Sequence, residues 1–291
     1  RAIEQTVKLG DVVLDIGTGT GILAIGAAKA GAKHVYAIES SALADVARRM
    51  VEDNGMTAAV TVIQGWSHEV ELPQKANVLV SETVGDGAMG ERILESVLDA
   101  RRRLLTPDAK IIPRSIKVGV AAVSLTPALL DHYTFSADNV AKWNADYEMD
   151  FKSLKDIEPD PDRLTPYRMR TRDYSSCTPL GKPLWLATVE LASFAEPLLH
   201  SSATLEVNRD GYLHGLVLFF ELELSGGEKL STAPAGTPGS AISSDCHWRI
   251  PLWLRAQPLK VTAGDDFQIT FDYSLGISRL RMRSAPPSLN V

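Results

Sequence analysis

Three glycines follow a short apolar run near the start of this 291-residue chain. The run occupies residues 11–16, and Gly17, Gly19 and Gly21 come directly after it. A continuous apolar run that stops at glycines is typical of a strand buried in a parallel sheet. Glycine also permits a tight turn whose backbone N–H groups approach a ligand closely. The sequence therefore predicts an α/β fold with a ligand site at this loop.

Alternating strand and helix signals continue through the first third of the chain. The helix-like segments are residues 20–30, 40–54 and 91–105, and the strand-like segments after the glycine loop are residues 34–38, 60–63 and 77–81. Repeated strand–helix units indicate a doubly wound, Rossmann-like parallel sheet. We expect this domain to span residues 1–113.

The character of the sequence changes near Pro113. Beyond it, β-branched and alternating segments predict an antiparallel sheet or barrel over residues 114–291. The strand-like segments are 116–123, 185–191, 204–207, 213–224, 259–261 and 267–273. A charged, proline-containing stretch at about 138–175 interrupts them and is interpreted as an arm or long insertion.

Charge and cysteine content exclude several kinds of partner. The formal net charge is −6, which does not suit sequence-independent binding to nucleic acid. The two cysteines, Cys177 and Cys246, fit neither a metal-ligand spacing nor a disulfide framework, which favours a reducing, cytoplasmic location without a metal. No apolar run approaches the roughly 20 residues of a membrane-spanning helix, and no signal peptide is recognisable.

The glycine loop has features of an S-adenosylmethionine site. Its spacing is G-x-G-x-G, which differs from the G-x-G-x-x-G of dinucleotide-binding folds and suits a cofactor without a pyrophosphate. Asp15 precedes the loop, where it can position the turn or meet the amino group of the cofactor. Glu39 ends the next strand, where a carboxylate can accept both ribose hydroxyls. The alternative is a glycine-rich turn of some other α/β protein.

Two glutamates flank a glycine-rich loop after the strand at 77–81. Glu82 closes that strand at the sheet edge where ligands bind, and Glu91 opens the next helix. Arginine's guanidinium is always protonated, and two carboxylates can bind it from two edges through charge-assisted hydrogen bonds. Such a clamp draws positive charge away from one guanidinium nitrogen and aims that nitrogen at a methyl donor. The alternative is that Glu91 is a first-turn acid favoured by the helix dipole and Glu82 a cofactor contact.

The chain resembles the protein arginine methyltransferase family over nearly its whole length. VLDIGTGTGIL at 13–23 looks like the family's cofactor motif, and AIE at 37–39 like its ribose-binding strand end. SETVGDGAMGE at 81–91 looks like its double-glutamate loop, with both acids in register. Pro113 falls where the family passes from its cofactor domain to a β-barrel. Cys246-His247-Trp248 looks like its Thr-His-Trp loop.

The resemblance implies a role for each part of the site. Glu82 and Glu91 would bind the guanidinium, His247 would order the active site, and Trp248 would line the substrate pocket. It also implies a barrel and a homodimer formed through the arm. The implied catalytic residues are Glu82, Glu91 and His247. The implied cofactor-binding residues, which include Ser67 and His68 at the adenine edge, are Asp15, Gly17, Thr18, Gly19, Gly21, Ile22, Glu39, Ser40, Ser67, His68 and Glu82.

The loop between the acids is poor in aromatic residues and predicts a roomy pocket. Met89 is expected on the wall near the methyl group, and Asp86 is expected to meet an extra positive charge such as a free α-amino group. The expected substrate is therefore arginine, either in a peptide or as the free amino acid in a small-molecule pathway. A methyltransferase for another small nucleophile and an inactive dimeric scaffold of the same fold are the alternatives.

Overall fold

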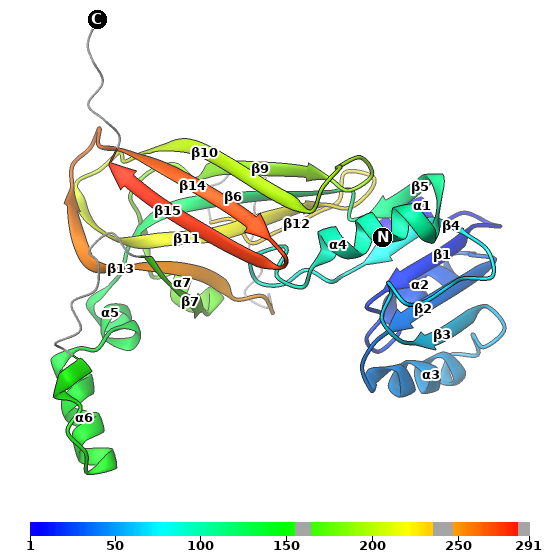
Figure 1. The fold of residues 1–291 in the computed structure, drawn as a ribbon, viewed down its shortest axis with the longest axis horizontal. Helices are drawn as coiled ribbons and strands as arrows, with labels where there is room; N and C mark the ends of the chain where they lie inside the picture. Colours follow the sequence, from blue (N-terminus) through cyan, green and yellow to red (C-terminus); the bar gives the residue numbers. More distant parts are fainter. Residues whose placement is uncertain (155–163, 235–246, 285–291) are drawn as a thin grey trace, which may run out of the picture.

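The computed structural model describes residues 1–154, 164–234 and 247–284. Its N-terminal part is a five-stranded sheet in the order β3-β2-β1-β4-β5, and every pairing in it is parallel. The strands are β1 (Val12–Ile16), β2 (His34–Glu39), β3 (Val60–Gln64), β4 (Ala76–Ser81) and β5 (Leu105–Ile112). The parallel sheet that the sequence predicts is confirmed (Figure 1).

The chain order of this sheet reverses between β1 and β4. From β1 the chain proceeds outward to β2 and β3, then returns to β4 on the other side of β1. Ligands of doubly wound sheets bind at the carboxyl ends of the strands at such a reversal. Both the glycine loop after β1 and Glu82 after β4 lie there.

Four helices belong to this part of the molecule: α1 (Ala2–Thr6), α2 (Ile22–Lys29), α3 (Leu43–Asp53) and α4 (Ile93–Arg103). Neither α1 nor β5 is predicted from the sequence. The β5 segment contains Pro107 and Asp108, which are rare in strands. It forms a strand because it lies at the edge of the sheet, where proline does not interrupt a ladder on both sides.

The C-terminal part begins after Pro113 and consists of antiparallel strands. Five of them form the path β7-β13-β11-β6-β8, with β12 paired to β11 and β9 paired to β6, and a second sheet has the order β10-β14-β15. The strands are β6 (Ser115–Ser124), β7 (Leu164–Met169), β8 (Thr178–Pro179), β9 (Leu184–Glu190), β10 (Leu198–Glu206), β11 (Gly211–Glu223), β12 (Lys229–Ser231), β13 (Ile250–Val261), β14 (Asp266–Ser274) and β15 (Ile277–Ser284). The antiparallel character is confirmed, whereas closure into a barrel stays a prediction.

A single hydrophobic cluster connects the parallel and antiparallel sheets. It includes Leu14 and Ile38 of the first sheet, Leu94 of α4, and Phe220 and Tyr273 of the antiparallel strands, all buried. In Figure 1, α4 lies between the two parts of the molecule. The loop that carries Glu82 and Glu91 enters α4, so it is held where both parts meet.

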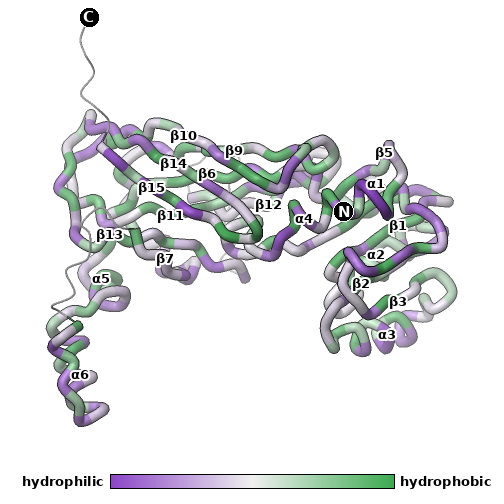
Figure 2. Tube along the Cα trace, in the orientation of Figure 1, coloured by the Kyte–Doolittle hydropathy of each residue, from purple (hydrophilic) through white to green (hydrophobic). Residues whose placement is uncertain are grey.

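Two helices, α5 (Pro127–Tyr133) and α6 (Ala137–Tyr147), project from the antiparallel part, followed by the short 3-10 helix η1 (Lys152–Leu154) (Figure 1). Polar and apolar colours alternate along α6 in Figure 2. The projection begins before the predicted arm boundary of 138. The predicted boundary of 175 is wrong, because β7 and the helix α7 (Thr171–Tyr174) occupy residues 164–169 and 171–174. β7 is an edge strand, where Pro166 and charged side chains are tolerated.

Among the described residues, no helix combines the length and the apolar character that crossing a membrane requires.

Candidate functional site

The glycine loop is folded tightly against β2. The backbone N–H groups of Gly17 and Thr18 both donate to the Ile38 carbonyl oxygen, at 2.9 and 3.0 Å. Gly17 has a φ of 75°, and a Cβ there would lie 2.5 Å from Cγ2 of Thr83. Gly19 has a φ of 55°, and a Cβ there would meet no atom within 4 Å. The loop therefore needs glycine for its own fold at Gly17 and leaves open space for a ligand beside Gly19.

Asp15 is fully buried beneath this loop. Its Oδ2 accepts a hydrogen bond from the Thr18 hydroxyl at 2.5 Å, so the side chain positions the turn. Burial raises the pKa of the Asp15 carboxyl to about 7, although the Thr18 hydroxyl and the Ala24 amide lower it. Of the two roles considered for Asp15, the geometry favours positioning of the loop.

Glu39 at the end of β2 also supports the loop. Its Oε2 accepts from the Gly19 N–H and its Oε1 from the Ser41 N–H, both at 2.9 Å. Burial by itself raises the pKa of Glu39, but hydrogen bonds from Ser41, Gly19 and Ser40 outweigh burial and leave the pKa lowered. The carboxylate is thus held in its charged form at the position that suits ribose hydroxyls.

The remaining predicted cofactor residues lie around the same sheet edge. Ile22 and Ser40 are exposed, Ser67 is half-buried, and His68 is exposed in the turn after β3. Sequence reasoning missed Trp66, which is 60% exposed with its ring 6.2 Å from that of His68. A large aromatic side chain exposed beside the predicted adenine edge offers a surface on which a purine can stack. An aromatic residue directly before Ser67 is the signal that could have identified it.

The loop that links β4 to α4 lines one side of an open cavity of about 440 Å³. Both Glu82 and Glu91 line the cavity and are accessible to solvent there. The helix begins two residues later than Glu91, and Arg92 precedes it with a φ of 64°. The other lining residues, from the loop and from the antiparallel part, are Val84, Gly85, Asp86, Gly87, Gly90, Arg168, His247 and Trp248.

The two glutamates and His247 are electrostatically coupled. Removal of water by the cavity walls raises the pKa of the Glu82 carboxyl, the nearby His247 lowers it, and the nearby Glu91 raises it, with a net upward shift. The structure thus brings Glu82, Glu91 and His247 together. Two neighbouring carboxylates in one cavity form a site for a single flat cation.

The cavity adjoins the glycine loop. The Ser81 hydroxyl donates to the Ile16 carbonyl oxygen at 2.9 Å, which ties the end of β4 to the end of β1. Thr83 packs directly against Gly17, as the 2.5 Å approach to a Cβ there shows. Glu82 lies between these two contacts in the chain. A ligand in the glycine loop and a cation between the glutamates would therefore be neighbours.

Trp248 anchors the acid loop to the antiparallel part. Its indole Nε1–H donates to the Val84 carbonyl oxygen at 2.7 Å. Its ring is buried and lies edge-on to Phe220, with ring centroids 5.1 Å apart. The exposed ring of His247 lies 4.4 Å from it. Trp248 therefore combines packing with cavity lining, whereas Cys246 of the same motif lies outside the described residues.

Asp86 does not present a free negative charge to a ligand, which corrects the expectation that it meets an α-amino group. The Nε and Nη2 atoms of Arg168 on β7 both contact Asp86 Oδ2. The other oxygen, Oδ1, accepts from the Arg249 N–H at 2.8 Å. Arg168 was missed because residues 164–169 were interpreted as part of the arm. The charge beside the glutamates is thus neutralised by the chain's own arginine.

Met89 is also placed differently from the prediction. Its side chain is fully buried in the hydrophobic cluster and does not line the cavity. Its carbonyl oxygen lies 3.1 Å from the Tyr273 hydroxyl. The prediction failed because a methionine in a glycine-rich loop was treated as exposed, whereas tertiary packing buries it.

Comparisons with known proteins agree with this arrangement. Residues 1–112 match the model of ribosomal protein L11 methyltransferase, and residues 123–283 match that of the arginine methyltransferase oligomerization subdomain. Protein arginine N-methyltransferase 2 of Xenopus tropicalis is 34% identical over 269 residues, covering 88% of this chain and 58% of that protein. Protein arginine N-methyltransferase 1 of Dictyostelium discoideum is 30% identical over 281 residues, covering 94% and 76%.

The chain belongs to the protein arginine methyltransferase family.

Solved structures show the same fold. The Trypanosoma brucei PRMT1 enzyme–prozyme heterotetrameric complex with AdoHcy matches with a TM-score of 0.73 and 26% identity, covering 99% of this chain and 84% of that one. Arabidopsis thaliana protein arginine methyltransferase 10 matches in fold with a TM-score of 0.69 and 24% identity, covering 90% and 79%. The chain spans 58% of the length of the Xenopus tropicalis relative.

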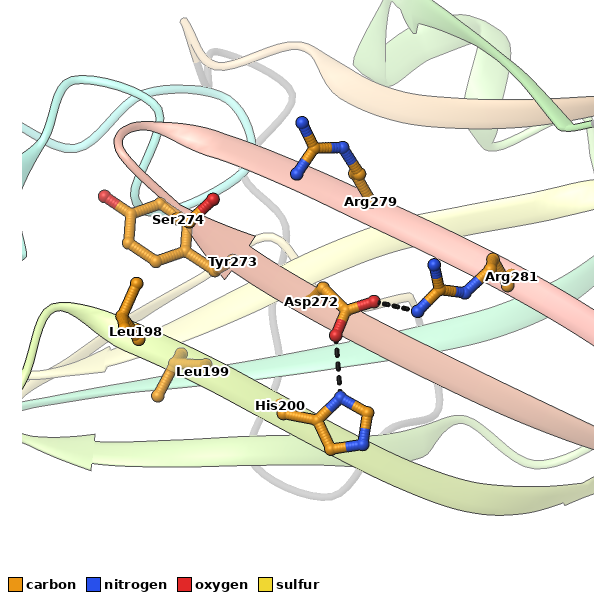
Figure 3. Close-up of a pocket in the computed structure, with 8 residues that line it drawn as sticks. All are labelled: Leu198, Leu199, His200, Asp272, Tyr273, Ser274, Arg279 and Arg281. Atoms are coloured by element: carbon orange, nitrogen blue, oxygen red, sulfur yellow. Dashed lines mark hydrogen bonds and ion pairs between the residues drawn. The ribbon is translucent and has the colours of Figure 1, made fainter.

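A second, more open hollow of about 690 Å³ lies on the sheet β10-β14-β15 (Figure 3). His200 Nδ1 lies 2.7 Å from Asp272 Oδ1, and Arg281 pairs with Asp272 Oδ2. The hydrogen bond from His200 is the main cause of a lowered pKa at Asp272. No residue of the predicted site lines this hollow, which is distinct from the cavity beside the glycine loop.

Proposed function

We propose that this chain transfers a methyl group from S-adenosylmethionine to the guanidino group of arginine. One observation carries the proposal: Glu82 and Glu91 line one cavity beside the glycine loop. Family membership supports it, since the curated relatives are named protein arginine N-methyltransferases.

The residues present fit the cofactor. Gly19 leaves open space where a Cβ would otherwise stand, and Glu39 holds a charged carboxylate at the ribose position. Asp15 keeps the loop in shape through Thr18. Bound there, S-adenosylmethionine supplies an electrophilic methyl group on a sulfonium. Ile22, Ser40, Ser67 and His68 complete the proposed cofactor site.

The chain's own residues prepare the acceptor nitrogen. Glu82 and Glu91 bind the guanidinium through charge-assisted hydrogen bonds and fix the nitrogen that attacks. A bound donor would supply the methyl group to this nitrogen, and the proton that the nitrogen loses would pass to a carboxylate of the chain. The raised pKa of the Glu82 carboxyl suits this carboxylate to accept that proton. His247, which interacts electrostatically with Glu82, helps to hold the glutamates in position.

The remaining parts of the proposal concern domains and assembly. Residues 1–113 form the cofactor domain, and residues 114–291 form the β-barrel substrate domain. The projecting helices α5 and α6 form a homodimerisation arm, and the match to an oligomerization subdomain supports this role. Phe135, Tyr147 and Met149 on this arm are more than half exposed, as expected for an interface. Sedimentation analysis would detect the dimer.

A labelled-methyl assay tests the reaction. The chain is incubated with methyl-labelled S-adenosylmethionine and either free L-arginine or an arginine-containing peptide, and products are identified by mass spectrometry. Methylated guanidino groups are expected from the wild-type protein, and at a much lower rate from Glu91→Gln. Methyl transfer to neither substrate by a protein that binds the cofactor would overturn the proposal. Full activity of Glu91→Gln would favour another small nucleophile as substrate.

A further inference from the structure

The three acids of the cavity are not equivalent. Glu82, Asp86 and Glu91 all come from the loop between β4 and α4 and line the same cavity. Asp86 is paired with Arg168, and its second oxygen accepts the Arg249 N–H. Two carboxylates therefore remain to bind one substrate guanidinium. Any other part of the substrate that lies beside Asp86 would meet the Asp86–Arg168 ion pair. Of these two residues, Arg168 is the one accessible to the substrate.

Arg168 keeps donors for a second acceptor. A guanidinium carries five N–H donors, and the contact with Asp86 Oδ2 uses Nε and Nη2. The Arg168 side chain is 75% exposed, whereas that of Asp86 is 15% exposed. The group that a substrate would meet here is thus a guanidinium edge, whose natural partner is a planar carboxylate.

This edge distinguishes substrates by charge. A lysine or arginine next to the methylated residue would face Arg168, while the negative charge of Asp86 is already compensated by that guanidinium. A carboxylate in the same place gains a charge-assisted hydrogen bond. Two sources can supply it: the α-carboxylate of free arginine, or an acidic neighbour in a peptide.

We propose that the methyl acceptor is an arginine with a carboxylate beside it, and that Arg168 is the specificity-determining residue that binds this carboxylate. The inference rests on the proposed function and names the substrate class for the same cavity. Asp86 orients Arg168, and Glu82 and Glu91 bind the guanidinium to be methylated.

The wild-type protein is tested on substrates that differ in this one charge. L-Arginine is compared with L-argininamide, and blocked peptides with arginine between two glutamates, two glutamines or two lysines are compared with one another. We expect kcat/KM to be about tenfold higher for the carboxylate-bearing member of at least one set. If kcat/KM differs only between L-arginine and L-argininamide, Arg168 binds the α-carboxylate of free arginine. If it differs only among the peptides, Arg168 binds an acidic neighbouring residue.

Variants then test the residue. Arg168→Gln removes the cation and frees Asp86, so the preference should vanish or reverse toward the lysine-flanked peptide. Arg168→Lys keeps the charge and should restore part of the preference. Arg172→Gln is the matched control, because Arg172 is 73% exposed and pairs with a neighbouring acid, Asp173, at 3.5 Å. It lies outside the lining of the cavity and should keep the wild-type preference.

Cofactor binding, measured by calorimetry, shows that each variant is folded. The proposal is overturned if the wild-type kcat/KM values for the lysine-flanked peptide and for argininamide equal those for the carboxylate-bearing substrates. An unchanged preference in Arg168→Gln also overturns it. Failure of the proposed function looks different: the cofactor binds, but every substrate is equally inert.

Discussion

The Tyr273 hydroxyl lies 3.1 Å from the carbonyl oxygen of Met89, two residues before Glu91. The same hydroxyl lies 2.8 Å from Glu95 Oε2 on α4 and accepts the Gly276 N–H at 3.2 Å. Because Tyr273 belongs to β14, one phenol joins the antiparallel sheet to both the acid loop and the helix that follows it.

Removal of this hydroxyl should loosen the acid loop. Tyr273→Phe keeps the buried ring but leaves buried polar atoms without a partner, which costs about 1–3 kcal/mol. We expect urea denaturation to show this loss and kcat to fall about tenfold. Tyr212→Phe, at a 54% exposed tyrosine of β11, is the control and should change neither. Unchanged stability in Tyr273→Phe would show that the phenol does not hold the loop.

A comparison of alanine variants at Gly17 and Gly10 distinguishes the effect of backbone strain from that of steric overlap. Both have positive φ angles, 75° and 93°, but a Cβ at Gly17 would overlap Thr83, whereas a Cβ at Gly10 would meet nothing within 4 Å. Gly10→Ala should cost about 1 kcal/mol of stability and leave cofactor affinity unchanged. Gly17→Ala should abolish S-adenosylmethionine binding in calorimetry. Equal affinities in the two variants would contradict the assignment of the loop.

Glu91→Gln should separate cofactor binding from methyl transfer. The amide keeps the size of the side chain but removes one charge of the guanidinium clamp, so kcat/KM for arginine should fall by about 100-fold. The affinity for S-adenosylmethionine should stay within about twofold. Glu71→Gln, at an 83% exposed side chain, serves as control. A large loss in Glu71→Gln would indicate a general effect of charge.

The raised pKa of Asp15 predicts a pH-dependent stability of the cofactor-free protein. Burial raises the pKa of the native Asp15 carboxyl to about 7, from its usual value of 3.8. Between these values the folded state binds more protons than the unfolded state, so this group lowers stability as pH rises. Asp15→Asn removes the effect. In urea unfolding, the free energy of unfolding of the variant minus that of wild type should therefore increase from pH 5 to pH 7.5. A difference that does not change with pH would contradict the raised pKa of Asp15.

Trp248 should contribute to substrate binding through its indole N–H. Trp248→Phe keeps an aromatic ring but leaves the Val84 carbonyl without its 2.7 Å partner, which frees the loop beside Glu82. We expect the KM for arginine to rise about tenfold, with a smaller change in cofactor affinity. Trp185→Phe on β9 is the matched control. Similar KM values in the two variants would reduce Trp248 to a packing residue.

Local sequence signals predict the first parallel strands and the glycine loop well. Buried strands are recognisable as apolar runs in the sequence. The tight loop at Gly17 and Gly19 requires glycine, so the spacing of the glycines predicts where the loop lies. Glu82 and Glu91 are also predictable, because Glu82 directly follows β4 and Glu91 lies two residues before α4. The structure brings these two together as the sequence predicts.

The substrate side depends on contacts between distant segments, which spacing does not reveal. Asp86 and Arg168 are 82 residues apart in the chain, and Arg168 lies on a strand whose proline and charges resemble a loop. Met89 has the composition of an exposed loop residue, and only its packing in the shared core shows otherwise. Edge strands such as β5 and β7 were missed for the same reason: their pattern reflects one neighbouring strand instead of two.

The edge position of β7 has a consequence for how this molecule can diversify. A strand with β13 as its single neighbour in the sheet order can exchange an outward side chain without disturbing the interior ladders. If Arg168 selects the acceptor as proposed, point mutations at position 168 would change which acceptors are used, while Glu82, Glu91 and the glycine loop remain untouched.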